Sequence, residues 1–178
     1  MARLCAKRAR LDSQSMSISD DLARIALQEQ QLRFSAFDEQ TAWRLGSRLR
    51  SLAVERGLVL VIDIRRVAQP LFFAALPGTT PDNAEWVRRK SNVVFRFQRS
   101  SYAIGLEMEQ KQSTLQDRYG LLLADYACHG GSFPVRARGA GFLGAVTVSG
   151  LPQRDDHNLV IEALCAELGA DYAALRLE

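Results

Sequence analysis

Apolar residues recur at helical spacing in four parts of the chain. They follow intervals of three and four residues after Ser17, after Asp38 and after Asp82, and again from Leu159 to Leu168. The first three segments start with a residue type that caps helix N-termini, and a glycine follows the second and the last. The pattern therefore predicts four main helices with defined ends.

Strand patterns occupy the segments between these helices. Leu58–Ile64 is apolar except for Asp63 and is rich in Val and Ile, which indicates a central strand covered on both faces. The connection to the next apolar run, 71–76, is too short for a crossover, so the two strands should be antiparallel. Weaker patterns predict a short strand at 32–37, strands at 134–136 and 142–148, a helix and a loop within 100–116, and either strand or helix at 121–126.

These elements predict an α/β (α+β) fold. The composition, 47% hydrophobic and 24% charged, is that of an ordinary globular protein. No internal repeat and no second domain is visible, so residues 16–178 are expected to form a single domain.

The net charge of +3 and the pI of about 9.0 would suggest a nucleic-acid partner if the charge were spread over the domain. The basic excess lies within residues 1–15, and the rest of the chain carries equal numbers of acidic and basic residues. We therefore expect no nucleic-acid partner. Residues 1–15 are interpreted either as a disordered basic tail or as an extension ahead of a true start at Met16.

The apolar runs and the cysteines bear on the cellular compartment. No run approaches the 18 or so apolar residues that a membrane span requires, so no membrane partner is expected. Cys5, Cys128 and Cys165 are odd in number and far apart, without disulfide or metal-ligand spacing. The sequence thus predicts a cytoplasmic protein without a metal site.

The passage from Gly139 to His157 is the most informative stretch of the chain. It combines glycines, a strand and a helix whose first turn carries Asp155, Asp156 and His157, where free amides attract anions. Three glycines match the offsets of the dinucleotide-binding motif, but they precede the strand, whereas the motif requires them after one. A dinucleotide site is therefore not predicted.

Lys90 is the exception in an apolar stripe of the third helix that includes Trp86 and Phe97. A lysine in this position is either a buried amine with a lowered pKa or a group that binds carboxylates. The more common arrangement lays its methylenes along the core edge and keeps the ammonium in water, and we take this as the expectation. Trp86 is expected in the core.

Two segments in combination, HGGSFPV from His129 and GAVTVSGLPQRDDH ending at His157, resemble an uncharacterised family of small cytosolic proteins. That family belongs to the haem-degrading, GlcG/HbpS-like superfamily. The helix segment from Trp86 to Lys90, with Ser91 after it, is similar to a lysine-bearing helix of that group. The resemblance implies a profilin-like three-layer domain, with a mostly antiparallel sheet between helices, and a homo-oligomer built from dimers.

The resemblance also indicates site residues. It matches Lys90, Asp156, the Gly130–Gly131 turn and the strand end Ser149–Gly150 to the superfamily pattern, while His129 and His157 belong to the closer family's version. We expect a pocket where these two glycine-containing segments meet His157, with Lys90 as an anion partner. No position matches an established haem-ligand motif, so the cofactor stays unknown, with haem as one possibility.

Three functions follow, and whether the protein is an enzyme stays open. The first is an oligomeric small-molecule-binding module, with a tetrapyrrole favoured by the resemblance because histidine ligates iron. The second is an enzyme acting on a small carboxylate or carbonyl compound, with Lys90 and His157 in acid–base roles. The third is a structural or partner-binding scaffold, which an exposed apolar patch would support.

Overall fold

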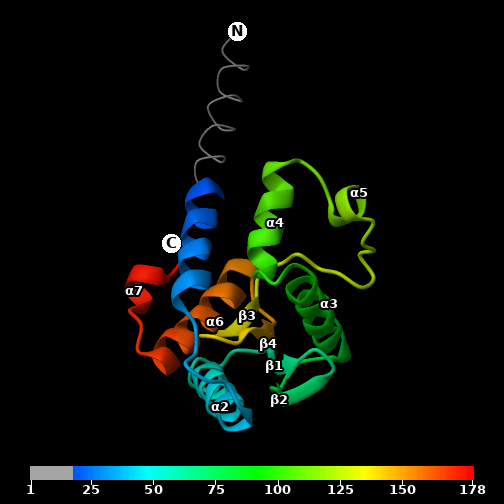
Figure 1. The fold of residues 1–178 in the computed structure, drawn as a ribbon. Coiled ribbons are helices and arrows are strands. Elements are labelled where there is room, and N and C mark those ends of the chain that lie inside the picture. The colour runs from blue at the N-terminus through cyan, green and yellow to red at the C-terminus, as the bar shows by residue number, and fades with distance from the viewer. Residues whose placement is uncertain (1–17) are drawn as a thin grey trace, which may run out of the picture.

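A four-stranded antiparallel sheet lies between two helical layers in the computed structural model, which describes residues 18–178 (Figure 1). The strands run in the order β2, β1, β4, β3 across the sheet. Their bounds are β1 Val61–Arg66, β2 Gln69–Ala75, β3 Ser132–Ala137 and β4 Gly141–Ser149. The expected α+β fold with a mostly antiparallel sheet is confirmed, and β1 lies inside the sheet as its mainly apolar run predicted.

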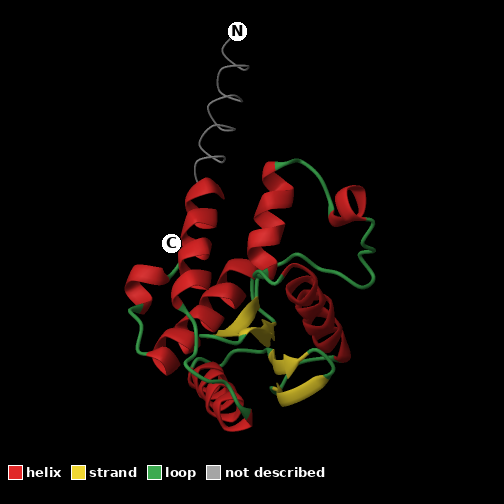
Figure 2. Ribbon diagram, in the orientation of Figure 1, coloured by secondary structure: helices red, strands yellow, loops and turns green. Residues whose placement is uncertain are grey.

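Helices cover the two faces of the sheet unequally (Figure 2). The helices α2 (Glu39–Glu55) and α6 (Gln153–Leu168) pack on one face and on each other, whereas α3 (Pro81–Phe97) packs on the other face, mainly over β4 and β3. The remaining helices are residues 18–31, α4 (Ser101–Gln110), α5 (Leu115–Tyr119) and α7 (Tyr172–Leu175). The chain therefore forms the three layers that the resemblance implied.

The face of the sheet toward α2 and α6 holds the main hydrophobic core. Ile62 and Ile64 of β1 are fully buried there, together with residues of β3, β4 and both helices. Successive side chains of a strand point to opposite faces, so Asp63 lies on the face toward α3. Thr147 of β4 lies opposite Asp63, and Ser132 of β3 lies opposite Thr147. A row of buried polar residues therefore crosses the sheet beneath α3.

Several predicted helix ends are confirmed and one is displaced. Asp38 caps α2 by accepting a hydrogen bond from the Thr41 amide at 2.8 Å, and α6 ends at Gly169 in a left-handed conformation. The third helix begins earlier than predicted, because Thr80 forms the capping box and Pro81 fills the first helical position. The Ser17 cap and the 1–15 tail lie outside the described residues.

Two weaker predictions were wrong, the strand at 32–37 and the strand or helix at 121–126. The segment 32–37 forms only one isolated bridge, from Phe34 to Ala137, because its other residues turn between two helices. The segment 121–126 is irregular, and its backbone is held against α3 by Arg88, Arg89 and Asn92 instead of by a sheet. Within residues 18–178, no helix is both long and apolar enough to span a membrane.

Gly46 allows the edge strand to pack against α2. The ring of Phe72 lies directly over this residue, and an added Cβ would lie 2.3 Å from the ring Cγ. In a helix interior, glycine to alanine normally stabilises by about 1 kcal/mol. The gain is smaller than the ~1–3 kcal/mol that overpacking costs.

We therefore expect Gly46→Ala to lower the free energy of unfolding by up to about 2 kcal/mol. Ser51→Ala, at an exposed position of the same helix, is the matched control and should change stability by less than about 0.5 kcal/mol. Urea denaturation followed by circular dichroism measures both. A more stable Gly46→Ala variant would contradict the packing described.

Candidate functional site

A cavity of about 250 Å³ opens between α3 and the turn from β4 to α6. Trp86 and Lys90 line it from α3, His129 lines it from the segment before β3, and Asp156 lines it from the first turn of α6. The rest of the wall is formed by Asp82, Asn83, Ser149, Gly150, Leu151 and Gln153. The cavity therefore brings together five of the predicted site residues, which are Lys90, His129, Ser149, Gly150 and Asp156.

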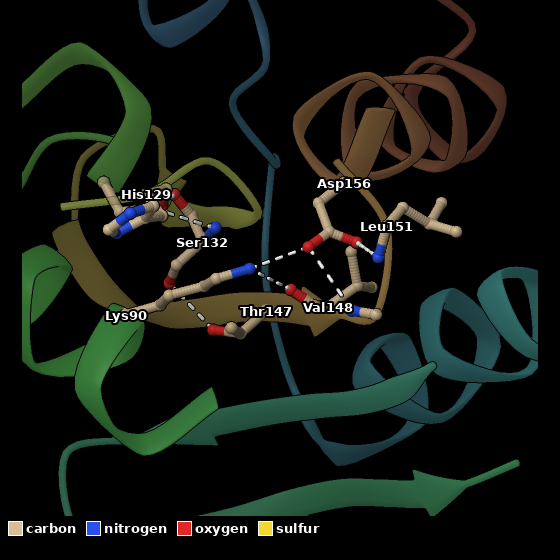
Figure 3. A network of polar contacts seen from close by, with 9 residues as sticks. Lys90, His129, Ser132, Thr147, Val148, Leu151 and Asp156 are labelled. Atoms are coloured by element: carbon tan, nitrogen blue, oxygen red, sulfur yellow. Dashed lines mark hydrogen bonds and ion pairs between the residues drawn. The ribbon is translucent and has the colours of Figure 1, made fainter. Parts of the chain in front are cut away.

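A buried ion pair lies in the wall of this cavity. Lys90 is only 3% exposed, and its Nζ donates hydrogen bonds to Asp156 Oδ2 at 2.7 Å and to the Val148 carbonyl at 3.3 Å (Figure 3). The expectation that this ammonium lies in water was wrong. The physical reason is that Asp156, in the first turn of α6, supplies a buried partner that the apolar stripe of α3 does not reveal.

Asp156 is held by the backbone as well as by the lysine. Its Oδ1 accepts a hydrogen bond from the Leu151 amide at 3.1 Å, and Oδ2 accepts a longer one from the Gly150 amide at 3.4 Å. Two amides of the turn before α6 are thus bound by a side chain of the protein itself. Lys90 was predicted to bind an anionic group of a ligand, but the anion that it binds in the structure is the carboxylate of Asp156.

Burial and pairing shift the pKa values of Lys90 and Asp156 in opposite directions. Burial is the largest influence on both groups: it lowers the pKa of Lys90 and raises the pKa of Asp156. The attraction and hydrogen bond between them oppose both shifts. Burial therefore favours the neutral forms of a lysine and a carboxyl group that lie in hydrogen-bond contact.

The two glycines of the HGG motif allow this approach of the backbone. A Cβ on Gly130 would lie 1.9 Å from the Gln153 carbonyl oxygen. Gly131 has a φ of +119°, and a Cβ there would lie 2.5 Å from the Val148 oxygen and 3.0 Å from Lys90 Nζ. Neither glycine is part of the lining of the cavity. They instead set the position of His129 against the turn from β4 to α6.

His129 presents a neutral imidazole to the cavity. The residue is exposed at the surface, and its ring meets the Trp86 ring edge-on, with 5.1 Å between centroids. Burial lowers the pKa of His129, and the nearby charges of Lys90 and Arg89 lower it further. The ring makes no hydrogen bond to another described residue, whereas the backbone carbonyl accepts one from the Ser101 hydroxyl at 2.5 Å. His129 thus has a fixed backbone and free ring nitrogens.

His157 lies elsewhere, so the predicted meeting of His157 with the two glycine-containing segments was wrong. It is 1% exposed and packs against Tyr102 and Phe133. Its Nε2 lies 2.8 Å from Gln28 Oε1, while Nδ1 has no partner among the described residues. Asp156 and His157 are consecutive on α6 and point about 100° apart, which separates them into different environments.

Sequence reasoning missed the amide and aromatic part of the wall. Asn83 and Gln153 were not predicted, and Trp86 was assigned to the core although it is half-buried beside the cavity. The position of Trp86 four residues before Lys90 was an available signal, because residues at this spacing share a helix face. Nothing local indicated that the first turn of α6 would bring Gln153 to the same place.

Residues 18–178 contain no cluster of three or more His, Cys, Asp and Glu side chains with the geometry to hold a metal ion. Cys128 and Cys165 are free thiols, and burial is the main cause that raises the pKa of both, for Cys165 to about 11. Cys128 therefore lacks the thiolate character that a cysteine nucleophile requires.

The three layers and the cavity define a class of small α+β domains with a site between one helix and the sheet. A family model described as "Haem degrading protein HbpS-like" matches residues 37–165. A UPF0303 protein from Acidobacterium capsulatum is 63% identical over 162 residues, which cover 91% of this chain and 98% of that protein. The chain therefore belongs to the HbpS-like family, as its HGG and C-terminal segments indicated.

Solved structures agree with this fold. The crystal structure of Ybr137w protein superimposes with a TM-score of 0.78 at 25% identity, covering 89% of this chain and 97% of that one. A structure described as the PduOC:Heme complex superimposes with a TM-score of 0.63 at 15% identity, covering 74% and 94% of the two chains. The second likeness shows the fold alone.

The cavity of this chain does not fit a haem group. Its volume of about 250 Å³ lies below the ~300–1,000 Å³ of sites for drug-sized ligands, and a tetrapyrrole with its propionates is larger than most of these ligands. His157 is buried among aromatic rings away from the cavity. Lys90, which could have received a propionate, is already paired with Asp156.

The burial of His157 makes stability depend on pH. Burial, reinforced by Arg154, lowers its pKa to about 3 in the folded protein, whereas the unfolded value is about 6.5. Above pH 6.5 His157 is neutral in both the folded and the unfolded state, so its burial does not reduce the free energy of unfolding. Stability is lost as the pH falls from about 6.5 toward 3, because only the unfolded state then takes up the proton.

We expect the free energy of unfolding to fall by about 2 kcal/mol between pH 7.5 and pH 5 through His157 alone. Urea denaturation at a series of pH values measures this slope. The matched variant is His157→Gln, which cannot take up a proton and should show a flatter profile, whereas His129→Gln should retain most of the slope. Equal slopes in the wild type and His157→Gln would contradict the assignment.

Proposed function

We propose that the protein is a binding module for a small polar molecule, and that the ligand occupies the cavity between α3 and the turn from β4 to α6. The observation that carries the proposal is His129, a neutral imidazole with free ring nitrogens in a concave site. A neutral imidazole offers one hydrogen-bond donor and one acceptor. Its backbone is fixed by Ser101 and by the glycines that follow it.

The lining supports a ligand with several polar atoms. Asn83 and Gln153 contribute amide side chains, Ser149 contributes a hydroxyl group, and Trp86 adds an aromatic wall. The volume of about 250 Å³ favours a molecule of metabolite size. The carboxylate of Asp82 disfavours a multiply charged anion, because the charge of Lys90 is already paired with Asp156.

A tetrapyrrole is the competing ligand. It is supported by the family description and by the haem complex of a protein with the same fold, and it is opposed by the size of the cavity. His129 is the only one of the two histidines in the chain that lines the cavity, so a haem ligand would have to be this residue. Both ligands would depend on His129, so the mass of the retained molecule and the presence of a Soret band distinguish them.

We expect native mass spectrometry of protein isolated from its own cells to show a retained molecule lighter than a tetrapyrrole. His129→Ala should lose it, because the ring that contacts the ligand is removed. Leu122→Ser, at a position 54% exposed and outside the cavity lining, is the control and should retain it.

Addition of haemin tests whether the ligand is a tetrapyrrole instead of a smaller molecule. A Soret shift that disappears in His129→Ala would overturn the small-ligand proposal in favour of a tetrapyrrole. A protein that carries no molecule and takes none from a cell extract would contradict both.

We also propose that the protein assembles with copies of itself, as a homo-oligomer built from dimers. Support comes from a second, apolar hollow of about 550 Å³ between α2 and β2, lined in part by Trp43, Leu71 and Phe73. Trp43 is 61% exposed and Phe73 is 53% exposed, and β2 is an edge strand of the sheet. Exposed apolar surface on an open edge is typical of association sites.

Phe73→Glu should shift the protein toward smaller species at equal concentration, because it places a charge on the open edge. Multi-angle light scattering at several concentrations measures the mass. The control is Leu122→Ser, which removes exposed apolar surface elsewhere and should leave the mass unchanged. A wild-type protein that is a monomer at every concentration would contradict the assembly.

The charge balance of residues 16–178 supports the proposal that nucleic acids are not partners. The free thiols Cys128 and Cys165 support the further proposal of a reducing cytoplasmic location.

A further inference from the structure

Lysine is rare in this chain, and one lysine lies in the candidate site. The sequence contains 20 arginines and three lysines, which are Lys7, Lys90 and Lys111. The side chain of Lys111 is 39% exposed beside Glu107 on the surface, whereas Lys90 is buried in the cavity wall. An arginine stays charged in proteins, but a buried lysine can lose its proton and become a nucleophilic amine.

Two hydrogen bonds leave one position on Lys90 Nζ open. Its Nζ donates to Asp156 and to the Val148 carbonyl, and it makes no other hydrogen bond to a described residue. An ammonium group has three N–H donors. After loss of the third proton, the amine keeps these two hydrogen bonds, and its lone pair takes the position that has no partner among the described residues.

The surroundings of Nζ provide room and proton carriers. Gly131 lies beside the amine, and a Cβ at that position would come within 3.0 Å of Nζ, so the glycine keeps this space open. Asp156 contacts the amine directly at 2.7 Å. His129 lines the same cavity with a neutral ring. One nucleophile and two groups able to transfer protons are therefore gathered in one cavity.

We propose that Lys90 forms a Schiff base with the carbonyl group of a small aldehyde or keto compound bound in the cavity. The proposal rests on the proposed function, since the ligand occupies the same cavity. The Nζ lone pair attacks the carbonyl carbon, the carbonyl oxygen takes up a proton, and the nitrogen loses the first of its two protons to give a carbinolamine. The hydroxyl group then takes up a second proton, the C–O bond breaks, the oxygen leaves as water, and the nitrogen loses its remaining proton to give the imine. No oxidant or reductant is consumed.

Asp156 and His129 have separate roles in this step. Asp156, in its acid form, donates a proton toward the leaving oxygen and recovers one from the nitrogen. His129 holds the carbonyl compound by a hydrogen bond from its ring. Burial lowers the pKa of Lys90 and raises that of Asp156, which favours the amine and acid forms that the reaction requires.

Reductive trapping tests the proposal on the intact protein. The protein is incubated at pH 7 with glyoxylate and sodium cyanoborohydride, and the modified residues are located by peptide mass spectrometry. We expect Lys90 to be modified faster than Lys111, because burial lowers the pKa of Lys90 and so raises its fraction of neutral amine. Lys111 and Lys7 serve as internal controls in the same sample.

Two variants separate chemistry from folding. Lys90→Arg keeps the positive charge but cannot form the imine, and should lose only the fast modification. His129→Ala should slow the modification of Lys90 severalfold while the circular dichroism spectrum stays unchanged. If Lys90→Arg fails to fold, the wild-type comparison of Lys90 with Lys111 still decides the question.

Modification of Lys111 with Lys90 unmodified would overturn the proposal. If the protein then still retains a small molecule in a manner dependent on His129, the Schiff base fails and the binding function stands. If no small molecule is retained either, both fail.

Discussion

The buried pair of Lys90 and Asp156 connects the two sides of the candidate site. It joins α3, which forms one layer, to the first turn of α6 in the other layer, across the end of β4. Removing one member of a buried pair typically costs about 3–5 kcal/mol, against a total stability of about 5–15 kcal/mol. Replacing both members by apolar residues is often neutral or stabilising. Stability alone therefore does not account for the pair, and its position in a cavity wall points to a chemical role.

The pair also organises the charges around it. It neutralises the carboxylate at the start of α6 and occupies the amides of the turn before that helix. It adds a positive charge near His129, which helps to keep that imidazole neutral. The cavity is consequently lined by a paired lysine, a neutral histidine and amide side chains, a set suited to hydrogen bonding and proton transfer more than to binding a strong anion.

Local patterns predicted most of the helices and strands, because these elements bury apolar side chains at regular spacing, while the three-layer arrangement was implied by the family resemblance. The mainly apolar run of β1, the Asp38 cap and the glycine that ends α6 all predicted what the structure shows. The site was predicted only in part, since its residues come from α3, the His129 segment and α6. The partner of Lys90 lies 66 residues away, and only the tertiary fold reveals that it is present. The same limit explains His157. A histidine is a common ligand residue, so it was expected in the pocket, but its position on α6 directs the side chain into the core.

The contact of Gly130 with the Gln153 carbonyl joins two stretches of main chain without any side chain between them. The shape of the site is thus determined by backbone packing, while its specificity is left to side chains such as Asn83, Ser149 and Gln153. Substitutions at these wall positions can change which molecule is accepted without disturbing the scaffold that holds the lysine and the histidine. A single architecture could in this way serve proteins with unlike ligands, and a shared fold would then be a poor guide to what each of them binds.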